Sequence, residues 1–498
     1  MNTNKILATP FLRQCYVTLG VTTNVMTIGL VVGYSAVIVP QLRETKQIEL
    51  DDESLSWIAS IIGFSMIFGA LIGPSIMSRQ GRKTALITGC ICNIIGWVLF
   101  IIASNMLMLI FARFFQGITV GILGVVAQVT IGEYTSPQYR GALLVLHPFS
   151  MCFGGLMQHV QGVYLTWKVV AVISLIINIV AILMVILSPE TPSFLATKGR
   201  FDSCRKSFHW LRGHDEDDEL EKMIKAAMLI KTDQGEEHFS VLKYGKDKIK
   251  YASETIKKKE FYKPVIIILH LQLLNLFSGS CLNETYAMEI FMDIFGNFNE
   301  MYYVLWSLDV QRIVTLALSM ITIRKVKRKN VLLVTTLLNI IVFISIAGYV
   351  YGKLVGVFSN CTAVGVVLLH LHYFTMAAGC ILLPNIIAGE ICPLEYRGIC
   401  GMISTLSYST YLTVEFKTVA LLFGKIGLQG AYLVYATVVG FSLIVLMMLL
   451  PETKDKTLLE IEWEFKGSQA DNECSEKMID LTKKVKLDSV SICSKQST

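Results

Sequence analysis

Acidic side chains within apolar sequence are the first residues here that could bind a ligand or carry a proton. The stretch SGSCLNETYAMEI, residues 278–290, begins at the C-terminal end of the uncharged run 264–283 and contains two carboxylates, Glu284 and Glu289, close to the thiol of Cys281. A charged group inside a membrane is costly and normally faces a cavity or a partner. In a continuous helix Glu289 shares a face with Tyr286, whereas Glu284 points the other way. We therefore expect this stretch to face the extracellular half of a cavity.

A second pair of charged residues, Asp309 and Arg312, lies in the apolar stretch near 301–323. In a helix the two side chains are one turn apart and can pair. Two interpretations follow: a structural ion pair, or direct contact between Arg312 and a ligand. In the preceding stretch, the Gly279-Ser280 step can interrupt the helix, as happens in discontinuous membrane helices at binding sites.

The composition indicates that membrane helices position these residues. Of the 498 residues 53% are hydrophobic and 16% charged, which is unusual for a soluble protein. Uncharged runs that approach or exceed the ~20 residues of a membrane-spanning helix occur at 14–42, 54–78, 84–112, 114–132, 141–167, 169–189, 264–283, 330–352, 354–389 and 426–451. Two further spans, near 301–323 and 399–423, contain internal charges. The sequence thus predicts an all-α membrane protein with about twelve spans.

Lysine and arginine residues indicate the orientation of these spans. They follow the even-numbered spans on one side, whereas the first loop on the other side, RETKQIELDDES, is net acidic. Short loops rich in Lys and Arg stay in the cytoplasm, so both termini are predicted to be cytoplasmic. The net charge of +6 is then a topological signal, and no nucleic-acid partner is inferred from it.

The spans form two groups of six, separated by a charged segment. We predict an N-terminal six-helix bundle at 1–187, a cytoplasmic linker with short helices at 188–263, a C-terminal six-helix bundle at 264–450 and a cytoplasmic, largely disordered tail at 451–498. Internal repetition supports this division, because EYTSPQYRG (133–141) and EICPLEYRG (390–398) occur once in each half.

Other chemistry is largely excluded. The twelve cysteines fall mostly in spans or cytoplasmic segments, which favours free thiols, and they lack metal-ligand spacing, so neither a metal nor another cofactor is expected. No nucleophile elbow, phosphate-binding loop or paired-acid pattern indicates an enzyme. The isolated histidines are interpreted as hydrogen-bonded packing residues. Asn360, in the sequon Asn360-Cys361-Thr362 of an outer loop, is the predicted glycosylation site.

Six motifs, in order along about residues 16–465, resemble the markers of the sugar porters of the major facilitator superfamily. They are RQGRK (79–83), RFFQGITVG (113–121), EYTSPQYRGAL (133–143), PETPSFLATKGR (189–200), GEICPLEYRG (389–398) and PETKDKTLLEIE (451–462). Within that family, SWIAS (56–60) and Lys417-Thr418 are most similar to the insect facilitated trehalose and hexose transporters. The resemblance implies the major facilitator fold and transport by alternating access.

The resemblance also implies that charged motif residues form ion pairs at the cytoplasmic ends of the helices. Such pairs can hold the inner side closed in the outward-open state. The matching residues are Arg82, Glu133, Arg140 and Glu190 in the N-terminal half and Glu390, Arg397 and Glu452 in the C-terminal half. The alternative is that these charges only fix topology. The C-half loop RKVKRK (324–329) lacks the acid and the glycine of the family pattern, so we expect a weaker C-half cluster.

Sugar porters line a midplane cavity with amides, which both donate and accept hydrogen bonds, and with aromatic rings, which stack on sugars. Many of those positions differ here: Pro148 replaces a glutamine and Arg312 an asparagine. The residues expected to contact the substrate are Asn275, Cys281, Tyr286, Arg312, Asn385 and Tyr408.

Energy coupling can be judged from VGYSAVIVP (32–40), where Ser35 stands in place of the aspartate of proton-coupled relatives. Serine cannot carry that proton, so facilitated diffusion is favoured, although the carboxylates of spans 7 and 8 leave proton coupling open. We expect a multi-pass plasma-membrane uniporter, embedded in lipid, for trehalose, a hexose or another polyol-like solute. The alternatives are a non-transporting sensor, favoured by the altered pocket, and a transporter of an anionic sugar-like solute, favoured by Arg312.

Overall fold

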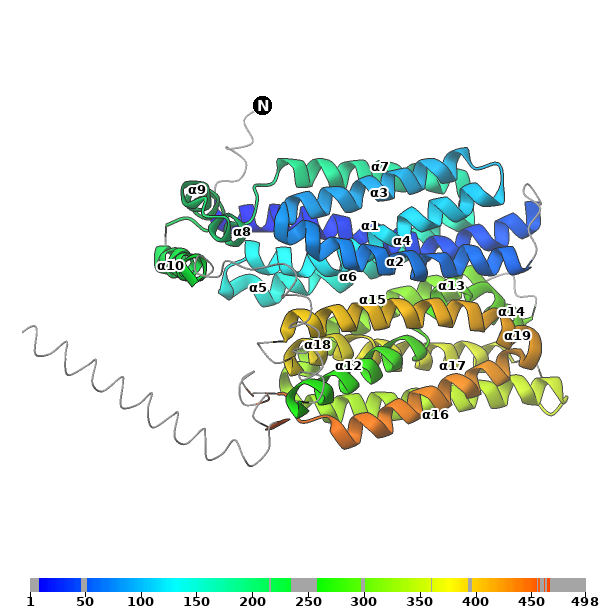
Figure 1. The fold of residues 1–498 in the computed structure, drawn as a ribbon. Coiled ribbons are helices and arrows are strands. Elements are labelled where there is room, and N and C mark those ends of the chain that lie inside the picture. Colours follow the sequence, from blue (N-terminus) through cyan, green and yellow to red (C-terminus); the bar gives the residue numbers. More distant parts are fainter. Residues whose placement is uncertain are drawn as a thin grey trace, which may run out of the picture.

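The computed structural model describes residues 9–45, 52–214, 216–233, 258–296, 301–359, 361–392, 396–454, 456, 461 and 464–465. Within these ranges every regular element is a helix, as Figure 1 shows. The predicted glycosylation site Asn360 and the tail beyond 465 lie outside the described residues.

The N-terminal half is a bundle of long apolar helices. They are α1 (Pro10–Thr45), α2 (Asp52–Arg79), α3 (Arg82–Ile102), α4 (Met106–Tyr134), α5 (Pro137–Leu144), α6 (Leu146–Tyr164) and α7 (Trp167–Leu187). The α4 helix begins where the Asn105 side chain accepts a hydrogen bond from the Met108 N–H at 3.0 Å. The α2 and α4 helices pack closely because Gly121 has no side chain: a Cβ there would lie 2.3 Å from the Met66 carbonyl.

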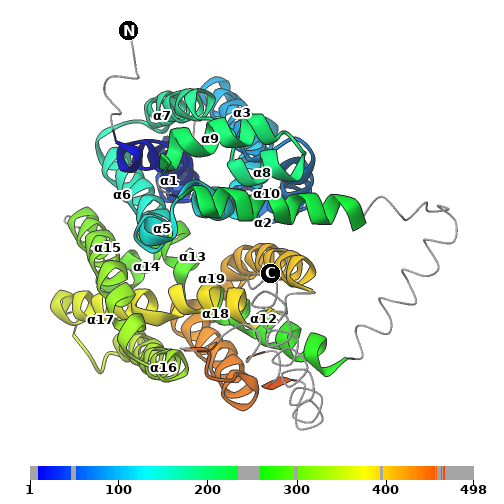
Figure 2. The same ribbon diagram turned by 90° about the vertical axis from the view of Figure 1, so that its left-hand side faces the viewer.

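Three short helices follow: α8 (Pro192–Thr197), α9 (Phe201–Arg212) and α10 (Asp217–Asp233). They cover one end of the N-terminal half, as Figure 2 shows from that side. Polar bonds attach them there, since Arg212 donates to the Thr135 carbonyl and Gln14 donates to the Leu211 carbonyl. We call this end of the bundles the linker end and the opposite end the distal end.

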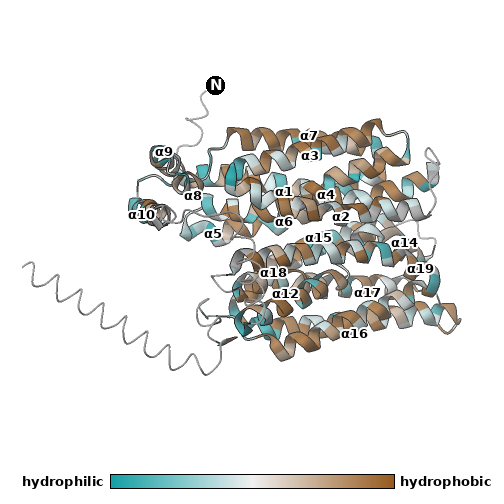
Figure 3. Ribbon diagram, viewed as in Figure 1, coloured by the Kyte–Doolittle hydropathy of each residue, from teal (hydrophilic) through white to brown (hydrophobic). Residues whose placement is uncertain are grey.

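The C-terminal half repeats the bundle. Its helices are α12 (Lys259–Phe277), α13 (Ser280–Thr285), α14 (Ala287–Phe295), α15 (Met301–Lys325), α16 (Arg328–Leu354), α17 (Thr362–Thr375), the π-helix η2 (Met376–Cys380), α18 (Leu382–Ile391) and α19 (Arg397–Leu449). The first of them begins at Lys259, within the predicted linker. Apolar residues cover the helices along their length, and hydrophilic residues gather at the bundle ends and on α9 and α10 (Figure 3).

Eleven stretches of the described chain are long and apolar enough to cross a membrane. The predicted span near 399–423 is not one of them, but it is helical and forms the first part of α19. Gly427, at φ 70°, separates it from the last span. With this segment the structure contains the about twelve spans expected from the sequence.

The predicted interruption of the seventh span is confirmed. The α12 helix ends at Phe277, Gly279 adopts φ 94°, and α13 starts at Ser280. A side chain at Gly279 would meet His372, since its Cβ would lie 2.7 Å from Nε2 of that imidazole. Asn283 approaches the same Nε2 at 2.6 Å and thereby ties α13 to α17.

Candidate binding cavity and charge clusters

A cavity of about 250 Å³ lies between the two halves. Its walls come from α1, α2, α4 and α6 on one side and from α12, α13, α15, α19 and the segment around α18 on the other. The polar or titratable lining residues include Gln128, His147, Gln272, Asn275, Ser280, Arg312, Asn385, Ser404, Thr405 and Tyr408. Both halves thus contribute polar groups to one shared cavity.

Two of these lining side chains keep a buried polar atom available. Gln272 donates through its amide nitrogen to the Ser404 hydroxyl at 2.8 Å, whereas its Oε1 has no hydrogen-bond partner among the described residues. His147 Nε2 likewise has none in that part of the chain. Buried polar atoms normally have partners, so these two atoms are suited to a ligand with hydroxyl groups.

Four of the expected substrate residues line the cavity: Asn275, Arg312, Asn385 and Tyr408. The side chain of Cys281 lies outside the described ones. Tyr286 is not among the cavity residues. The helix axis changes between α13 and α14 at this residue, and its ring packs 5.9 Å from that of Phe423, so the expected contact is not present here.

Sequence reasoning missed several lining residues, of which Gln128 and Gln272 are the clearest. Gln128 is a single amide in the apolar run ILGVVAQVTIG, and Gln272 lies one turn before Asn275 on α12. An uncharged amide within a membrane span needs a polar partner or a cavity, and that signal could have identified both residues.

Of the two interpretations of Asp309 and Arg312, the structural ion pair is wrong, because Asp309 pairs with another residue. Asp309 Oδ2 lies 2.6 Å from Nδ1 of His159, which belongs to α6 in the other half, and both side chains are only 1% exposed. Arg312, one turn further along α15, lines the cavity instead. His159 is hydrogen-bonded and buried, as expected for the histidines. Its partner could not be identified, because the sequence does not show which residues of the two halves face each other.

Ser35 lies beside a buried arginine of α4. Arg113 donates to the Ser35 hydroxyl at 3.0 Å, to the Val31 carbonyl at 2.8 Å and to the Gln116 side-chain oxygen at 3.2 Å. All three acceptors are neutral, and the guanidinium also lies over the ring of Tyr34. Arg113 is therefore held by these three neutral acceptors and not by a carboxylate among the described residues.

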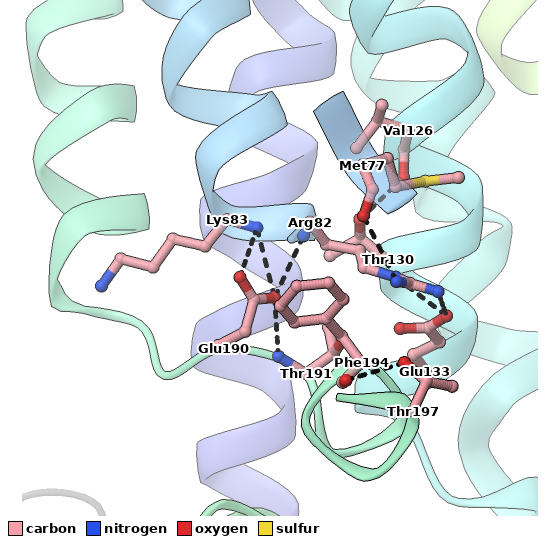
Figure 4. Close-up of polar contacts among 10 residues, drawn as sticks. All are labelled: Met77, Arg82, Lys83, Val126, Thr130, Glu133, Glu190, Thr191, Phe194 and Thr197. Atoms are coloured by element: carbon pink, nitrogen blue, oxygen red, sulfur yellow. Dashed lines mark hydrogen bonds and ion pairs between the residues drawn. The ribbon is translucent and has the colours of Figure 1, made fainter. Parts of the chain in front are cut away.

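A cluster of charges at the linker end connects four segments of the N-terminal half, as Figure 4 shows. The Arg82 guanidinium contacts Glu133 of α4 at 2.6 Å. Glu190, just after α7, accepts from the backbone N–H groups of Arg82, Lys83 and Thr191 at 2.9–3.3 Å. The Lys83 ammonium in turn donates to the Ser188 carbonyl at 2.9 Å. The connection between α2 and α3 thus joins the ends of α2, α3, α4 and α7.

Gly81 makes this arrangement possible. Its φ of 110° is one that residues with a side chain rarely adopt, and a Cβ there would lie 2.2 Å from Oε2 of Glu190. The carboxylate therefore occupies the space that a side chain would fill. Burial raises the pKa of Glu190, and the N–H groups of Thr191, Lys83 and Arg82 oppose that shift by stabilising the charged form.

The C-terminal half contains an equivalent cluster built from Arg328, one of the bases of RKVKRK. The Arg328 guanidinium pairs with Glu390. Glu452 accepts from the backbone N–H groups of Arg328 and Lys329 at 3.1 and 3.3 Å, and the Lys329 ammonium donates to the Leu450 carbonyl at 2.8 Å. These contacts reproduce those of Arg82, Glu133, Glu190 and Lys83 one by one.

The predicted gating residues are thus only partly brought together. Arg82, Glu133 and Glu190 form one cluster, and Glu390 and Glu452 belong to the other. Arg140 instead donates to the Thr135 carbonyl at 3.3 Å, because Glu133 points toward Arg82. The side chain of Arg397 lies outside the described ones. Arg328 was missed as a partner, although in the C-half loop it has the position that Arg82 has in RQGRK.

Comparison with known proteins agrees with this architecture. The profile of the family described as "Sugar (and other) transporter" matches residues 16–465. This chain belongs to that family. It is 27% identical to the facilitated trehalose transporter Tret1 of Culex quinquefasciatus over 90% of this chain and 85% of the relative. Identity to Tret1 of Apis mellifera ligustica is also 27%, over 92% and 89%.

Solved structures show the same fold. The inward-open xylose transporter XylE from E. coli superposes with a TM-score of 0.70 at 17% identity, over 90% of this chain and 99% of that chain. The proton:xylose symporter XylE bound to 6-bromo-6-deoxy-D-glucose also gives a TM-score of 0.70, at 16% identity, over 91% and 99%. The chain therefore has the major facilitator fold, and it is a sugar-transporter homologue rather than an enzyme.

Proposed function

We propose that this protein carries a sugar such as trehalose or a hexose across the plasma membrane by facilitated diffusion. The observation that supports this most directly is the cavity shared by the two halves, in which Gln272 Oε1 and His147 Nε2 have no partner among the described residues. A polyol can satisfy both atoms at once, and the apolar lining, such as Leu316, suits its CH faces. The names of the Tret1 relatives point to the same class of substrate.

Uniport is supported by the surroundings of Arg113. On α1 its guanidinium donates to the Ser35 hydroxyl and to the Val31 carbonyl. Because residue 35 is a serine and not an aspartate, neither α1 acceptor of the Arg113 guanidinium can take up a proton. Sugar movement would then follow its own concentration gradient.

The two charge clusters fit a cycle in which each half moves as a unit. Each cluster ties helix ends within one half, through Glu190 or Glu452, and its contacts among the described residues stay within that half. We place the linker end in the cytoplasm, with both termini, and the distal end outside. Large apolar side chains on outward-facing helix surfaces, such as Ile176 (55% exposed) and Ile344 (51% exposed), would contact lipid.

The test is uptake of labelled trehalose, glucose, polyols and organic acids into oocytes at about pH 5.5 and pH 7.5. Saturable sugar uptake that is equal at both values supports the proposal. A Gln272→Leu variant should raise KM, whereas Gln311→Leu should not, because the Gln311 amide bonds to the His370 carbonyl and does not line the cavity. Uptake restricted to organic acids would indicate an anionic substrate. No uptake despite surface expression would favour a sensor.

A further inference from the structure

The two halves are joined near their distal ends by contacts that belong to neither charge cluster. Arg43 at the end of α1 pairs with Glu289 of α14 at 2.7 Å. The Lys417 ammonium of α19 lies 3.5 Å from the ring centre of Trp57 on α2. The rings of Tyr164 and Trp306 are 5.9 Å apart. In this structure the halves are thus in contact at the distal end.

These contacts differ strongly in burial. The Arg43 and Glu289 side chains are 46% and 33% exposed, and solvent-exposed ion pairs contribute little. Trp57 is 43% exposed. The His159–Asp309 contact is the exception, because each side chain is only 1% exposed and the two atoms are 2.6 Å apart. Among these four contacts it is the one most sensitive to the loss of one partner.

We propose that His159 and Asp309 form the lock that holds the distal gate shut during the transport cycle. No described residue bonds to the second polar atom of either side chain, His159 Nε2 or Asp309 Oδ1. When α6 and α15 separate, both groups gain water. While the helices stay together, each depends on the other. The pair therefore favours the closed distal gate only when both members are present.

The surroundings of the pair support this assignment. A groove of about 300 Å³ at the distal end reaches His159 and is also lined by Ala36 and Val37 of α1. The nearest charged residue along α15 is Arg312, one turn toward the central cavity. The lock thus lies between the distal groove and the cavity, where separation of the helices would join the two spaces.

Loss of one partner and loss of both should have different consequences. Removing one leaves a buried group without its partner, which is strongly unfavourable, whereas replacing both by apolar residues is often neutral. We expect His159→Leu and Asp309→Leu each to shift the protein toward the state with an open distal gate. The double variant should return toward the wild-type equilibrium.

The test uses Ala36→Cys, a buried position in the groove, in a background with Cys361→Ala, because Cys361 is exposed. The rate of modification by a membrane-impermeant thiol reagent is measured on whole cells. We expect each single variant to react about tenfold faster or more, and the double variant to react within about threefold of the wild type. Gln311→Leu, which breaks a bond within the C-terminal half, is the matched control and should not change the rate.

Rates equal to the wild type in both single variants, or a double variant as reactive as the singles, would overturn the lock. If His159→Leu does not reach the surface, His159→Gln replaces it with the same expected direction. The inference rests on the proposed alternating cycle but needs no substrate. A failure of sugar uptake would therefore leave this measurement interpretable.

Discussion

Replacing Gly81 by alanine should destabilise the N-terminal half. The new Cβ would lie 2.2 Å from Glu190 Oε2 and 3.0 Å from the Phe194 ring, at a φ of 110°. A backbone conformation of this kind costs about 1–3 kcal/mol in a residue with a side chain, and each charge-assisted bond that Glu190 loses costs about 1.5–3 kcal/mol. We expect a total loss of about 3 kcal/mol or more.

The measurement is the unfolding temperature of the purified protein, followed with a dye that becomes fluorescent on reaction with thiols. Cys90, Cys204 and Cys380 are fully buried and report unfolding when they become reactive. A loss of about 3 kcal/mol in the free energy of unfolding corresponds to a fall of roughly 6–12 °C in the unfolding temperature for a unit of the size of the N-terminal half.

The chain provides a matched control. Lys327 occupies the position of Gly81 in the C-terminal cluster but has an ordinary φ of −59°, so Lys327→Ala should change the unfolding temperature by less than about 2 °C. Equal effects of the two substitutions, or an unchanged temperature for Gly81→Ala, would refute the assigned role of Gly81.

Three further outcomes are expected. Arg328→Gln should reduce the maximal uptake rate about tenfold or more, because Arg328 and Glu390 are only 20% and 26% exposed and a charge-assisted bond of this kind is worth about 1.5–3 kcal/mol; an unchanged rate would contradict this. Arg312→Gln should change KM for a neutral sugar less than about threefold, because we expect no direct bond from Arg312 to such a sugar, and loss of a charged hydrogen bond would change KM by more than that. A selective loss of organic-acid uptake would instead indicate an anionic substrate. Ser35→Asp places a carboxylate beside Arg113 and should make uptake differ between about pH 5.5 and pH 7.5; a flat profile would show that this position does not decide coupling.

The helices and one cluster follow from local sequence, and this explains what could be predicted. Uncharged runs define the spans, because hydrocarbon excludes charges wherever a helix lies. The break at Gly279 follows from glycine's freedom to adopt positive φ. Arg82, Glu133 and Glu190 were found because their motif recurs at fixed distances from helix ends.

The remaining features depend on how helices are placed against each other. The pairing of His159 with Asp309 joins residues 150 positions apart in different halves, and neither residue indicates the other. The interpretation of Asp309 with Arg312 used the only distance available from sequence, one helical turn. Arg328 was missed for another reason. The altered RKVKRK loop hid its equivalence to Arg82, although the backbone brings Arg328 to the equivalent position with Lys327 in place of the glycine.

The interruption at Gly279 separates two tasks that a continuous seventh span would combine. Asn275, before the break, lines the cavity, whereas Glu289, after it, joins the halves at the distal end. A substitution before the break can thus alter the lining of the cavity without rotating the residues after the break. Substrate preference can therefore diverge in this protein while the moving parts are retained, which is consistent with a chain whose pocket departs from the family pattern more than its cytoplasmic motifs do.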